Sequence, residues 1–282
     1  TVQIALNINP YLIDGKTVFI KSRAKPLHDM PTMNKGSQPT CGGNLILSES
    51  EKSELITKYA ESVVWIKEFI GGDEFINNRK RYCLWLKGVS PVNYVKIPEI
   101  MKRLRQVSEF RLTSPTASVR EFARFLALFT QDRQPDTFYL VIPEVSSEQR
   151  EYIPIGFLSP EVIASNKLQI IPNADLYLFG ILTSGMHMAW MRTICGRMKS
   201  DYSYSPSIYF NFPFPDQTDK SRTAIEALAN RVLEVRASYE ELSLAVLYNR
   251  LTMPPELVKA HNKLDAEVEK AYGKRFYTDS DR

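Results

Sequence analysis

Hydrophobic and polar side chains alternate in one segment near residue 200. Lys199, Asp201 and Ser203 occupy one parity, and Tyr202 and Tyr204 occupy the other. Because successive side chains of an extended strand point to opposite faces, the pattern predicts a strand that presents Lys199, Asp201 and Ser203 together. Such a face is often the solvent side of an amphipathic strand. It can also read base pairs, since lysine donates to guanine, aspartate accepts from cytosine, and serine does either.

The rest of the chain mixes predicted strands with predicted helices. Short apolar runs between turn residues are typical of strands, and amphipathic runs with polar starts are typical of helices. The spacing of Ser48 and Glu51 is that of a capping box and opens the first helix. The predicted strands cover residues 2–8, 17–21, 63–70, 82–86, 138–145, 152–158 and 168–171. The predicted helices cover residues 48–60, 97–110 and 183–197, and residues 28–44 form a long loop.

The character of the chain changes after Asn211-Phe-Pro-Phe-Pro215, which can continue neither a helix nor a central strand. Residues 225–235 then show an amphipathic helical pattern, and a second such helix starts at Pro254-Pro255. His261 lies on the apolar side of that second helix and is predicted to be packed. We therefore expect an α+β domain over residues 1–215, with mixed and antiparallel sheets and packed helices. A small all-α module follows over residues 216–282.

Several polar positions are candidates for contacts with phosphate. Segment 35–43 combines a lysine with glycines whose backbone N–H groups can approach an anion, and residues 79–81 are three consecutive cations. Plain surface loops and solvated charge runs have the same composition. The candidates for contact with the DNA backbone are Lys35, Ser37, Arg79, Lys80, Arg81 and Arg103.

Composition and charge narrow the class of protein. The chain has 44% hydrophobic and 24% charged residues, as ordinary globular proteins do, and lacks an apolar run of membrane-spanning length. Its three cysteines are widely spaced, which favours a reducing cytosol over a disulfide framework. Residues 1–215 carry 25 Lys and Arg against 20 Asp and Glu, whereas residues 216–282 have a balance of −1. A polyanion is therefore expected to face the first three quarters.

Motifs for catalysis are missing. The sequence lacks a glycine-rich phosphate loop, a Gly-x-Ser-x-Gly elbow, a His-Glu-x-x-His pair and zinc-type spacing of Cys and His. Asn9-Pro10-Tyr11 is similar to the Asn-Pro-Pro-Tyr of adenine-N6 methyltransferases but lacks the second proline. The first residue is Thr1 and not methionine, which suggests a piece of a longer protein. We expect no catalysis and no cofactor or metal site in this chain by itself.

Many linked motifs resemble the region that follows the methyltransferase domain in the MmeI-like family of single-chain bacterial restriction–modification enzymes. The likeness covers nearly the whole chain. Among the matching segments are Val18-Phe-Ile-Lys-Ser-Arg-Ala-Lys-Pro-Leu27, Phe69-Ile-Gly-Gly-Asp-Glu-Phe-Ile76, Arg81-Tyr-Cys-Leu-Trp-Leu86, Tyr152-Ile-Pro-Ile-Gly-Phe-Leu158, Cys195-Gly-Arg-Met-Lys-Ser-Asp-Tyr202, Asn211-Phe-Pro-Phe-Pro215 and Leu251-Thr-Met-Pro-Pro255.

The resemblance implies a target recognition domain up to about residue 215, followed by the family's C-terminal helical region. In that family the recognition domain reads an asymmetric duplex site in the major groove. A separate methyltransferase domain of the same chain flips out an adenine and methylates N6 with S-adenosylmethionine, and a nuclease domain, where present, cuts at a distance. The partners implied are double-stranded DNA and the protein's own methyltransferase domain, in the bacterial cytoplasm, with no membrane.

The family's base-reading positions carry over by motif context. One pair falls on Lys199 and Asp201, which agrees with the parity argument. Ser203 is expected to work with Lys167, and Asn166 with Glu144. The chemistry suggests a G·C pair facing Lys199 and Asp201. The alternative is a protein-interaction module without base readout, in which the helical tail and the aromatic strand contact a partner.

Overall fold

The structure is a computed structural model that describes residues 6–12, 14–276, 279 and 282. The chain forms two compact units. Unit 1 comprises residues 1–34, 138–157 and 169–282, and unit 2 comprises residues 35–137 and 158–168. The C-terminal helices share unit 1 with strands of the recognition region. The domain boundary near residue 215 stays a prediction.

Unit 1 is built on two sheets. The first has the strand order β1-β9-β5-β7, and β5 is buried along its whole length. The second has the order β10-β11-β6 and is antiparallel. The strands are β1 (Asn34–Lys35), β5 (Tyr139–Pro143), β6 (Val145–Ser146), β7 (Gly156–Leu158), β9 (Leu168–Pro172), β10 (Gly196–Met198) and β11 (Asp201–Ser203).

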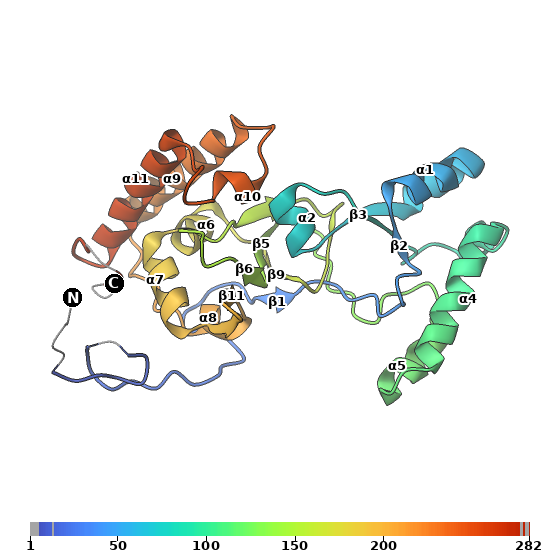
Figure 1. Cartoon of the computed structure of the whole chain (residues 1–282), viewed down its shortest axis with the longest axis horizontal. Coiled ribbons are helices and arrows are strands. Elements are labelled where there is room, and N and C mark those ends of the chain that lie inside the picture. Colours follow the sequence, from blue (N-terminus) through green and yellow to red (C-terminus); the bar gives the residue numbers. More distant parts are fainter. Residues whose placement is uncertain (1–5, 13, 277–278, 280–281) are drawn as a thin grey trace. The chain divides into compact units, whose positions relative to one another are not determined.

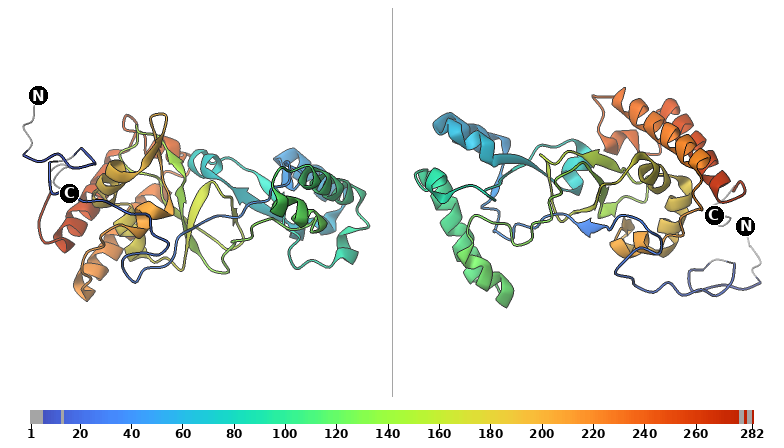
Figure 2. Two further views of the ribbon diagram at one scale, coloured as in Figure 1. Left: turned by 90° about the horizontal axis from the view of Figure 1, so that it is seen from below. Right: turned by 180° about the vertical axis from the view of Figure 1, so that it is seen from behind.

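Helices pack on these sheets and on one another, and α9 and α11 lie side by side in all three views (Figures 1 and 2). A capping box of Thr218 and Ser221 starts α9, and Pro255 occupies the first turn of α11. Their apolar stripes are buried against α6 and α7. The helices of unit 1 are α6 (Leu176–Leu182), α7 (Gly185–Ile194), α8 (Pro206–Phe210), α9 (Asp219–Ala237), α10 (Leu244–Leu247) and α11 (Pro255–Ala271).

A buried carboxylate joins α11 to α7. Asp265 accepts a hydrogen bond from the backbone N–H of Gly185 at 2.7 Å and one from the hydroxyl of Tyr152, also at 2.7 Å. The N–H of Gly185 belongs to the first turn of α7, whose N–H groups lack partners inside the helix. Burial raises the pKa of Asp265 to about 6 despite these two bonds. The contact fixes the start of the helix that leads into the β10–β11 hairpin.

Unit 2 has one sheet of order β2-β4-β3-β8, in which β3 pairs antiparallel with β4 and parallel with β8. Helix α4 buries Ile100, Leu104 and Val107, one turn apart, against this core. The strands are β2 (Ile46–Leu47), β3 (Ile66–Ile70), β4 (Tyr82–Leu84) and β8 (Ile163–Ala164). The helices are α1 (Glu49–Lys58), α2 (Gly72–Asn77), α3 (Pro91–Tyr94), α4 (Pro98–Leu112) and α5 (Ala117–Glu121), with 3-10 turns η1 (Ala60–Trp65) and η2 (Phe122–Arg124).

The α+β prediction is confirmed, as are the helices near residues 48–60 and 97–110 and the two helices after Pro215. Several element predictions were wrong. Residues 17–21 form no strand, and residues 63–65 belong to a 3-10 turn. The helix predicted to reach Arg197 ends at Ile194, and residues 196–198 form strand β10 instead. Most of the predicted strand at 2–8 lies outside the described residues.

None of the helices in the described part of the chain combines the length and apolar character needed to cross a membrane.

Candidate nucleic-acid interface

The candidate base-reading residues near 200 lie on a β-hairpin. Strands β10 and β11 pair with Met198 opposite Asp201, which leaves Lys199 and Ser200 as a two-residue turn. Lys199 has φ of 59°, in the left-handed region that lysine rarely adopts. The prediction of one continuous strand through Lys199 was therefore wrong, because alternation does not detect a reversal of the chain. Both turn residues are exposed, so the ammonium group is presented at the tip of the hairpin.

Strand β11 carries the other two residues of the predicted face. Asp201 and Ser203 are half-buried and share one face of the strand, while Tyr202 between them is buried on the other. Ser203 lies opposite Val145 of β6, and Tyr202 lies opposite Ser146. The buried tyrosine anchors the strand, and its neighbours remain accessible.

Arg197 braces this hairpin, a role that the sequence did not predict. Its guanidinium lies 4.4 Å from the ring centre of Tyr202, donates to the carbonyl of Ser200 at 2.9 Å and pairs with Glu148 at 3.5 Å. These contacts cross the turn and restrict its motion. Arg197 lies opposite Tyr202 across the hairpin, and this pairing would have revealed its role. The pairing can be predicted only when the position of the turn is known.

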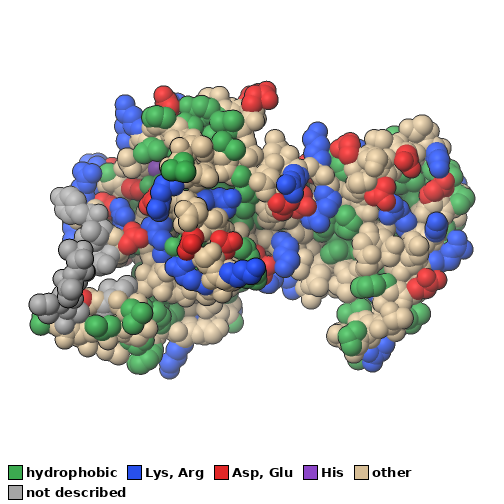
Figure 3. All heavy atoms as spheres, in the orientation of Figure 1, with side chains coloured by type: hydrophobic (Ala, Val, Ile, Leu, Met, Phe, Trp, Pro, Cys, Tyr) green, Lys and Arg blue, Asp and Glu red, His purple; other side chains and the backbone are tan. Residues whose placement is uncertain are grey.

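The surface around the hairpin carries charge of both signs. Figure 3 shows Lys and Arg side chains gathered over β6 and β11, with Asp and Glu side chains among them. Arg150 is half-buried there, and burial lowers its pKa while the charge of Asp201 opposes the shift. Such a surface offers both donors and acceptors to base edges, because Lys and Arg side chains donate and Asp and Glu side chains accept. The charged residues of these segments are Glu148, Arg150, Arg197, Lys199 and Asp201.

Glu144 lies where the two sheets of unit 1 meet. It is a half-buried residue at the bend between β5 and β6, and its carbonyl accepts from the N–H of Tyr204 at 2.7 Å. That bond continues the β6–β11 pairing by one residue. The fold therefore brings Glu144 close in space to β11, although the two are far apart in the sequence.

Asn166 and Lys167 form a second tight turn, in unit 2. The N–H of Leu168 donates to the carbonyl of Ser165 at 2.9 Å, and the N–H of Lys167 donates to the Ser165 hydroxyl at 3.2 Å. Asn166 is half-buried and Lys167 is exposed. Like Lys199, they are central residues of a two-residue turn. The expected cooperation of Lys167 with Ser203, and of Asn166 with Glu144, joins the two units and stays a prediction.

Two of the residues predicted to contact the DNA backbone, Ser37 and Arg103, make bonds inside the fold. Ser37 is fully buried, and its hydroxyl accepts from the N–H of Arg133 at 3.0 Å. The guanidinium of Arg103 donates to the carbonyls of Asn44 and Ile46. It also pairs with Glu51 at 2.6 Å. Burial keeps the Ser37 hydroxyl from phosphate, so that prediction was wrong. The Arg103 side chain is 22% exposed, and its contact with phosphate stays a prediction.

The basic turn at residues 79–81 offers two exposed cations. Arg79 and Lys80 are exposed, although Arg79 pairs with Asp73 at 2.8 Å. Arg81 is held inward by an ion pair with Glu74 at 2.9 Å and lies 4.9 Å from the ring centre of Phe69. Lys35 is an exposed residue of β1. Lys35, Arg79 and Lys80 therefore remain the accessible candidates for phosphate contacts.

The buried histidines are packing residues. The two ring nitrogens of His187 lie 2.7 Å from the carbonyl of Leu182 and 3.0 Å from the hydroxyl of Tyr204, and burial lowers its pKa to about 4. His261 stacks on Tyr152 at 4.1 Å, and burial lowers its pKa to about 3. Both rings are neutral at physiological pH. As predicted for His261, its ring is packed in the core, and so is that of His187. Among the described residues, no cluster of His, Cys, Asp and Glu could hold a metal ion.

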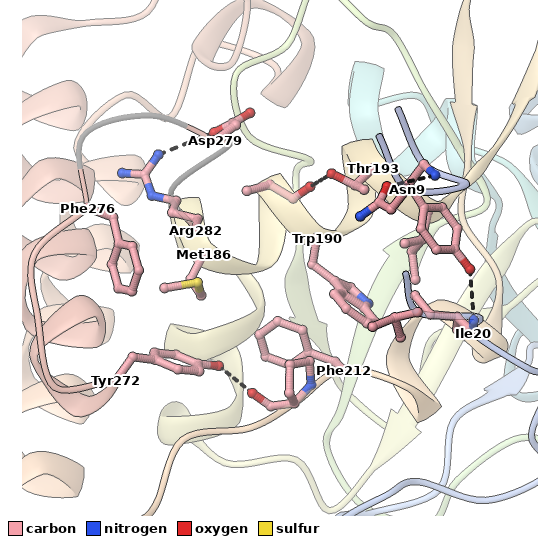
Figure 4. Close-up of a pocket in the computed structure, with 15 residues that line it drawn as sticks. Asn9, Ile20, Met186, Trp190, Thr193, Phe212, Tyr272, Phe276, Asp279 and Arg282 are labelled. Atoms are coloured by element: carbon pink, nitrogen blue, oxygen red, sulfur yellow. Dashed lines mark hydrogen bonds and ion pairs between the residues drawn. The ribbon is translucent and has the colours of Figure 1, made fainter. Parts of the chain in front are cut away.

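Unit 1 also contains an apolar cavity of about 450 Å³ (Figure 4). Its walls include Met186, Trp190 and Phe212. The polar groups in the lining already have partners. The hydroxyl of Tyr272 donates to the carbonyl of Pro213 at 2.8 Å, that of Thr193 donates to a carbonyl of its own helix at 2.9 Å, and Arg282 pairs with Asp279 at 3.3 Å. The cavity resembles a gap in packing more than a site with convergent polar groups.

The chain matches models of known protein families over almost its whole length. The family model described as the MmeI target recognition domain matches residues 14–216, and the MmeI C-terminal domain model matches residues 217–282. The chain belongs to the MmeI family. Together the two models leave only the first 13 residues unmatched.

Two relatives extend the match. DNA methyltransferase A of Bacillus subtilis (strain 168) is 39% identical over 284 residues, covering 100% of this chain and 32% of that protein. A solved structure of the type IIL restriction–modification enzyme MmeI in complex with DNA has a TM-score of 0.94 and 44% identity. It covers 98% of this chain, which spans 37% of that enzyme. The chain thus spans about one third of the length of each of these two proteins.

Proposed function

We propose that this chain is the sequence-reading part of a DNA methyltransferase of a restriction–modification system, and that it recognises a specific duplex site in the major groove. The observation that carries the proposal is the match of residues 14–216 to a target recognition domain, supported by the likeness to MmeI, whose structure was solved with DNA. The exposed β10–β11 hairpin and the Asn166–Lys167 turn are the parts of the chain proposed to contact the bases.

The β10–β11 hairpin is suited to enter the major groove. A two-stranded ribbon fits that groove, which is about 12 Å wide. At the tip, the ammonium of Lys199 can donate to guanine O6 and N7, while the carboxylate of Asp201 accepts from the N4 amine of cytosine. One G·C pair would satisfy both groups. Arg197 would keep the turn rigid, which lowers the entropy cost of presenting a long lysine side chain.

The remaining base-reading candidates would extend the site. Ser203 lies two residues beyond Asp201 on the same face of β11. Asn166 and Lys167 would reach base edges from their turn, and Glu144 would accept from a cytosine amine. Lys35, Arg79 and Lys80 would contact phosphates, which fixes register without reading sequence.

The chemistry of the whole protein would reside outside this chain. We infer an adenine-N6 methyltransferase domain that holds S-adenosylmethionine and flips the target base, working in the cytoplasm. This chain would contribute the choice of site, so the position of the flipped adenine relative to the bases it reads would be fixed by the geometry of recognition.

Competition binding at several salt concentrations tests the proposal. The full-length protein should bind its own site at least about 1,000-fold more tightly than random duplex. Its affinity should fall steeply between about 50 and 200 mM salt, because each phosphate contact releases counterions. Binding that ignores both sequence and salt would favour the alternative, a protein-interaction module.

A further inference from the structure

The Asn166–Lys167 turn rests on a short segment from a distant part of the sequence, residues 36–38. Three backbone hydrogen bonds join the two. The N–H of Gly36 donates to the carbonyl of Leu168 at 2.9 Å, and that of Ser37 donates to the carbonyl of Ala164 at 2.7 Å. The carbonyl of Ser37 accepts from the N–H of Asn166 at 3.0 Å. The bonds bracket the turn on both sides, so residues 36–38, the floor segment, set its position.

The floor segment approaches the turn as closely as two backbones can. A Cβ atom added to Gly36 would lie 2.4 Å from the carbonyl oxygen of Ser165 and 2.6 Å from that of Ala164. Both are backbone atoms, which cannot swing aside as a side-chain end can. Glycine is therefore required for close approach at this position.

The other side of the floor segment is anchored as firmly. Gln38 exchanges backbone hydrogen bonds with Gln131 at 2.8 and 3.1 Å, and the Ser37 hydroxyl accepts from the N–H of Arg133. The next two residues of the chain are held by Arg111, which is fully buried. Its guanidinium donates to the carbonyls of Pro39 and Thr40 at 2.8 and 2.9 Å, and to two more carbonyls near residues 125–128. The floor segment is thus fixed to the core of unit 2.

We propose that Gly36 and Ser37 are positioning residues for base readout: they set the height and direction at which Asn166 and Lys167 meet the DNA. The inference rests on the proposed function, because it assigns these two residues a role through the turn and no contact with DNA. Hydrogen bonds to base edges require placement within about 0.5 Å, so a small displacement of the turn removes discrimination while charge and phosphate contacts persist.

Gly36→Ala in the full-length protein tests the inference. Binding is measured on the recognised duplex and on every single base-pair substitution of it, and Asn166→Ala and Lys167→Ala identify the base pairs that the turn reads. We expect Gly36→Ala to lose about ten-fold or more discrimination at those pairs. Discrimination at the base pair assigned to Lys199, and the dependence of affinity on salt, should stay within about two-fold of the wild-type values. Gly15→Ala is the matched control, because the nearest described atom to its added Cβ is 3.9 Å away.

Ser37→Ala keeps the inference testable if Gly36→Ala does not fold. It removes the acceptor for the Arg133 N–H and leaves the three backbone bonds in place. We expect a loss of about three-fold or more, confined to the same base pairs. A folded Gly36→Ala that discriminates like the wild type, or that loses equally at every position, overturns the inference and leaves the proposed function standing. If neither Asn166→Ala nor Lys167→Ala changes any position, the reading role of the turn fails together with this inference.

Discussion

Lys199 combines exposure, positive charge and an unfavourable backbone conformation. Its φ of 59° costs a residue with a Cβ atom about 1 kcal/mol relative to glycine. A surface turn has no structural need for lysine at such a position, and Arg197 bonds to the next residue of the turn to hold it in place. Strained residues cluster at functional sites, and this one lies at the tip of the proposed ribbon.

Replacing Lys199 with glycine tests whether the turn is strained. Lys199→Gly should raise the free energy of unfolding by up to about 1 kcal/mol, because glycine adopts positive φ without strain. Urea denaturation measures this change, and Lys199→Ala is the matched control that keeps the strain. A Lys199→Gly variant less stable than Lys199→Ala would show that the turn is not strained.

The buried histidines give stability a dependence on pH. The pKa values of His187 and His261 are about 4 and about 3 in the folded chain, against 6.5 for free histidine. The unfolded chain therefore binds more protons below pH 6.5, and stability falls as pH falls through that value. Asp265, with a pKa of about 6, acts in the opposite direction, because the folded form binds a proton that the unfolded form releases. The net loss from pH 7 to pH 5 should be about 2 kcal/mol.

Urea denaturation at pH 5, 6 and 7 checks this balance. In Asp265→Asn the opposing contribution is absent, and the loss on acidification should grow to about 4 kcal/mol. The amide can still accept from Gly185 and donate to Tyr152, so the packing is conserved. Equal pH dependence in the two proteins would mean that Asp265 is ionised in the fold at neutral and mildly acidic pH alike.

At the scale of elements, α1 shows how local sequence determines where a helix starts. The Ser48 hydroxyl accepts from the N–H of Glu51 at 3.2 Å, and the Glu51 carboxylate accepts from the N–H of Ser48 at 2.8 Å. That second bond is the main reason why the pKa of Glu51 is lowered. The motif satisfies two N–H groups that otherwise lack partners.

Removing this cap should destabilise the fold by a local effect at the start of α1. Ser48→Ala should cost about 1 kcal/mol of unfolding free energy in chemical denaturation. Ser53→Ala in the same helix is the control, because the Ser53 hydroxyl only bonds back to the carbonyl of Glu49 on an exposed turn. A loss for Ser53→Ala equal to that for Ser48→Ala would contradict the capping argument.

Local signals predicted some elements and missed others for physical reasons. The capping box of α1 and the amphipathic stripes of α9 and α11 are local, so sequence was sufficient. Helix α6 is apolar on every face, and a short apolar run does not distinguish a buried helix from a strand. The Lys199–Ser200 turn has neither Gly nor Asn, the residues that normally mark a two-residue hairpin.

The candidate site was predictable to a similar extent. Parity alone singled out Lys199, Asp201 and Ser203, although the reversal at Lys199 was missed. Asn166, Lys167 and Glu144 were proposed only through the family resemblance. Gly36 gave no signal, because its role depends on a contact with residues about 130 positions later in the chain. Ser37 shows the opposite error, since polarity alone does not reveal that a hydroxyl is buried and already bonded inside the fold.

At the scale of the whole molecule, the candidate readers are distributed over both compact units. Glu144, Lys199, Asp201 and Ser203 belong to unit 1, whereas Asn166 and Lys167 belong to unit 2. Each reader lies in or beside a short turn or strand that a buried core supports. If these candidates read bases, exchanging one exposed side chain should change the base that is read with little effect on the fold, since surface substitutions usually alter stability by less than about 0.5 kcal/mol.

The most direct test of the central claim is a complete base-substitution profile of Lys199→Ala in the full-length protein. The recognised duplex is first selected from a randomised library, and binding is then measured for every single base-pair change, with Lys80→Ala as the comparison. Lys199→Ala should flatten discrimination at one base pair, by about 1–3 kcal/mol, and leave the other positions as they are. Lys80→Ala should weaken all duplexes alike. An equal loss on every sequence for Lys199→Ala would contradict the account of the hairpin as a reader of bases.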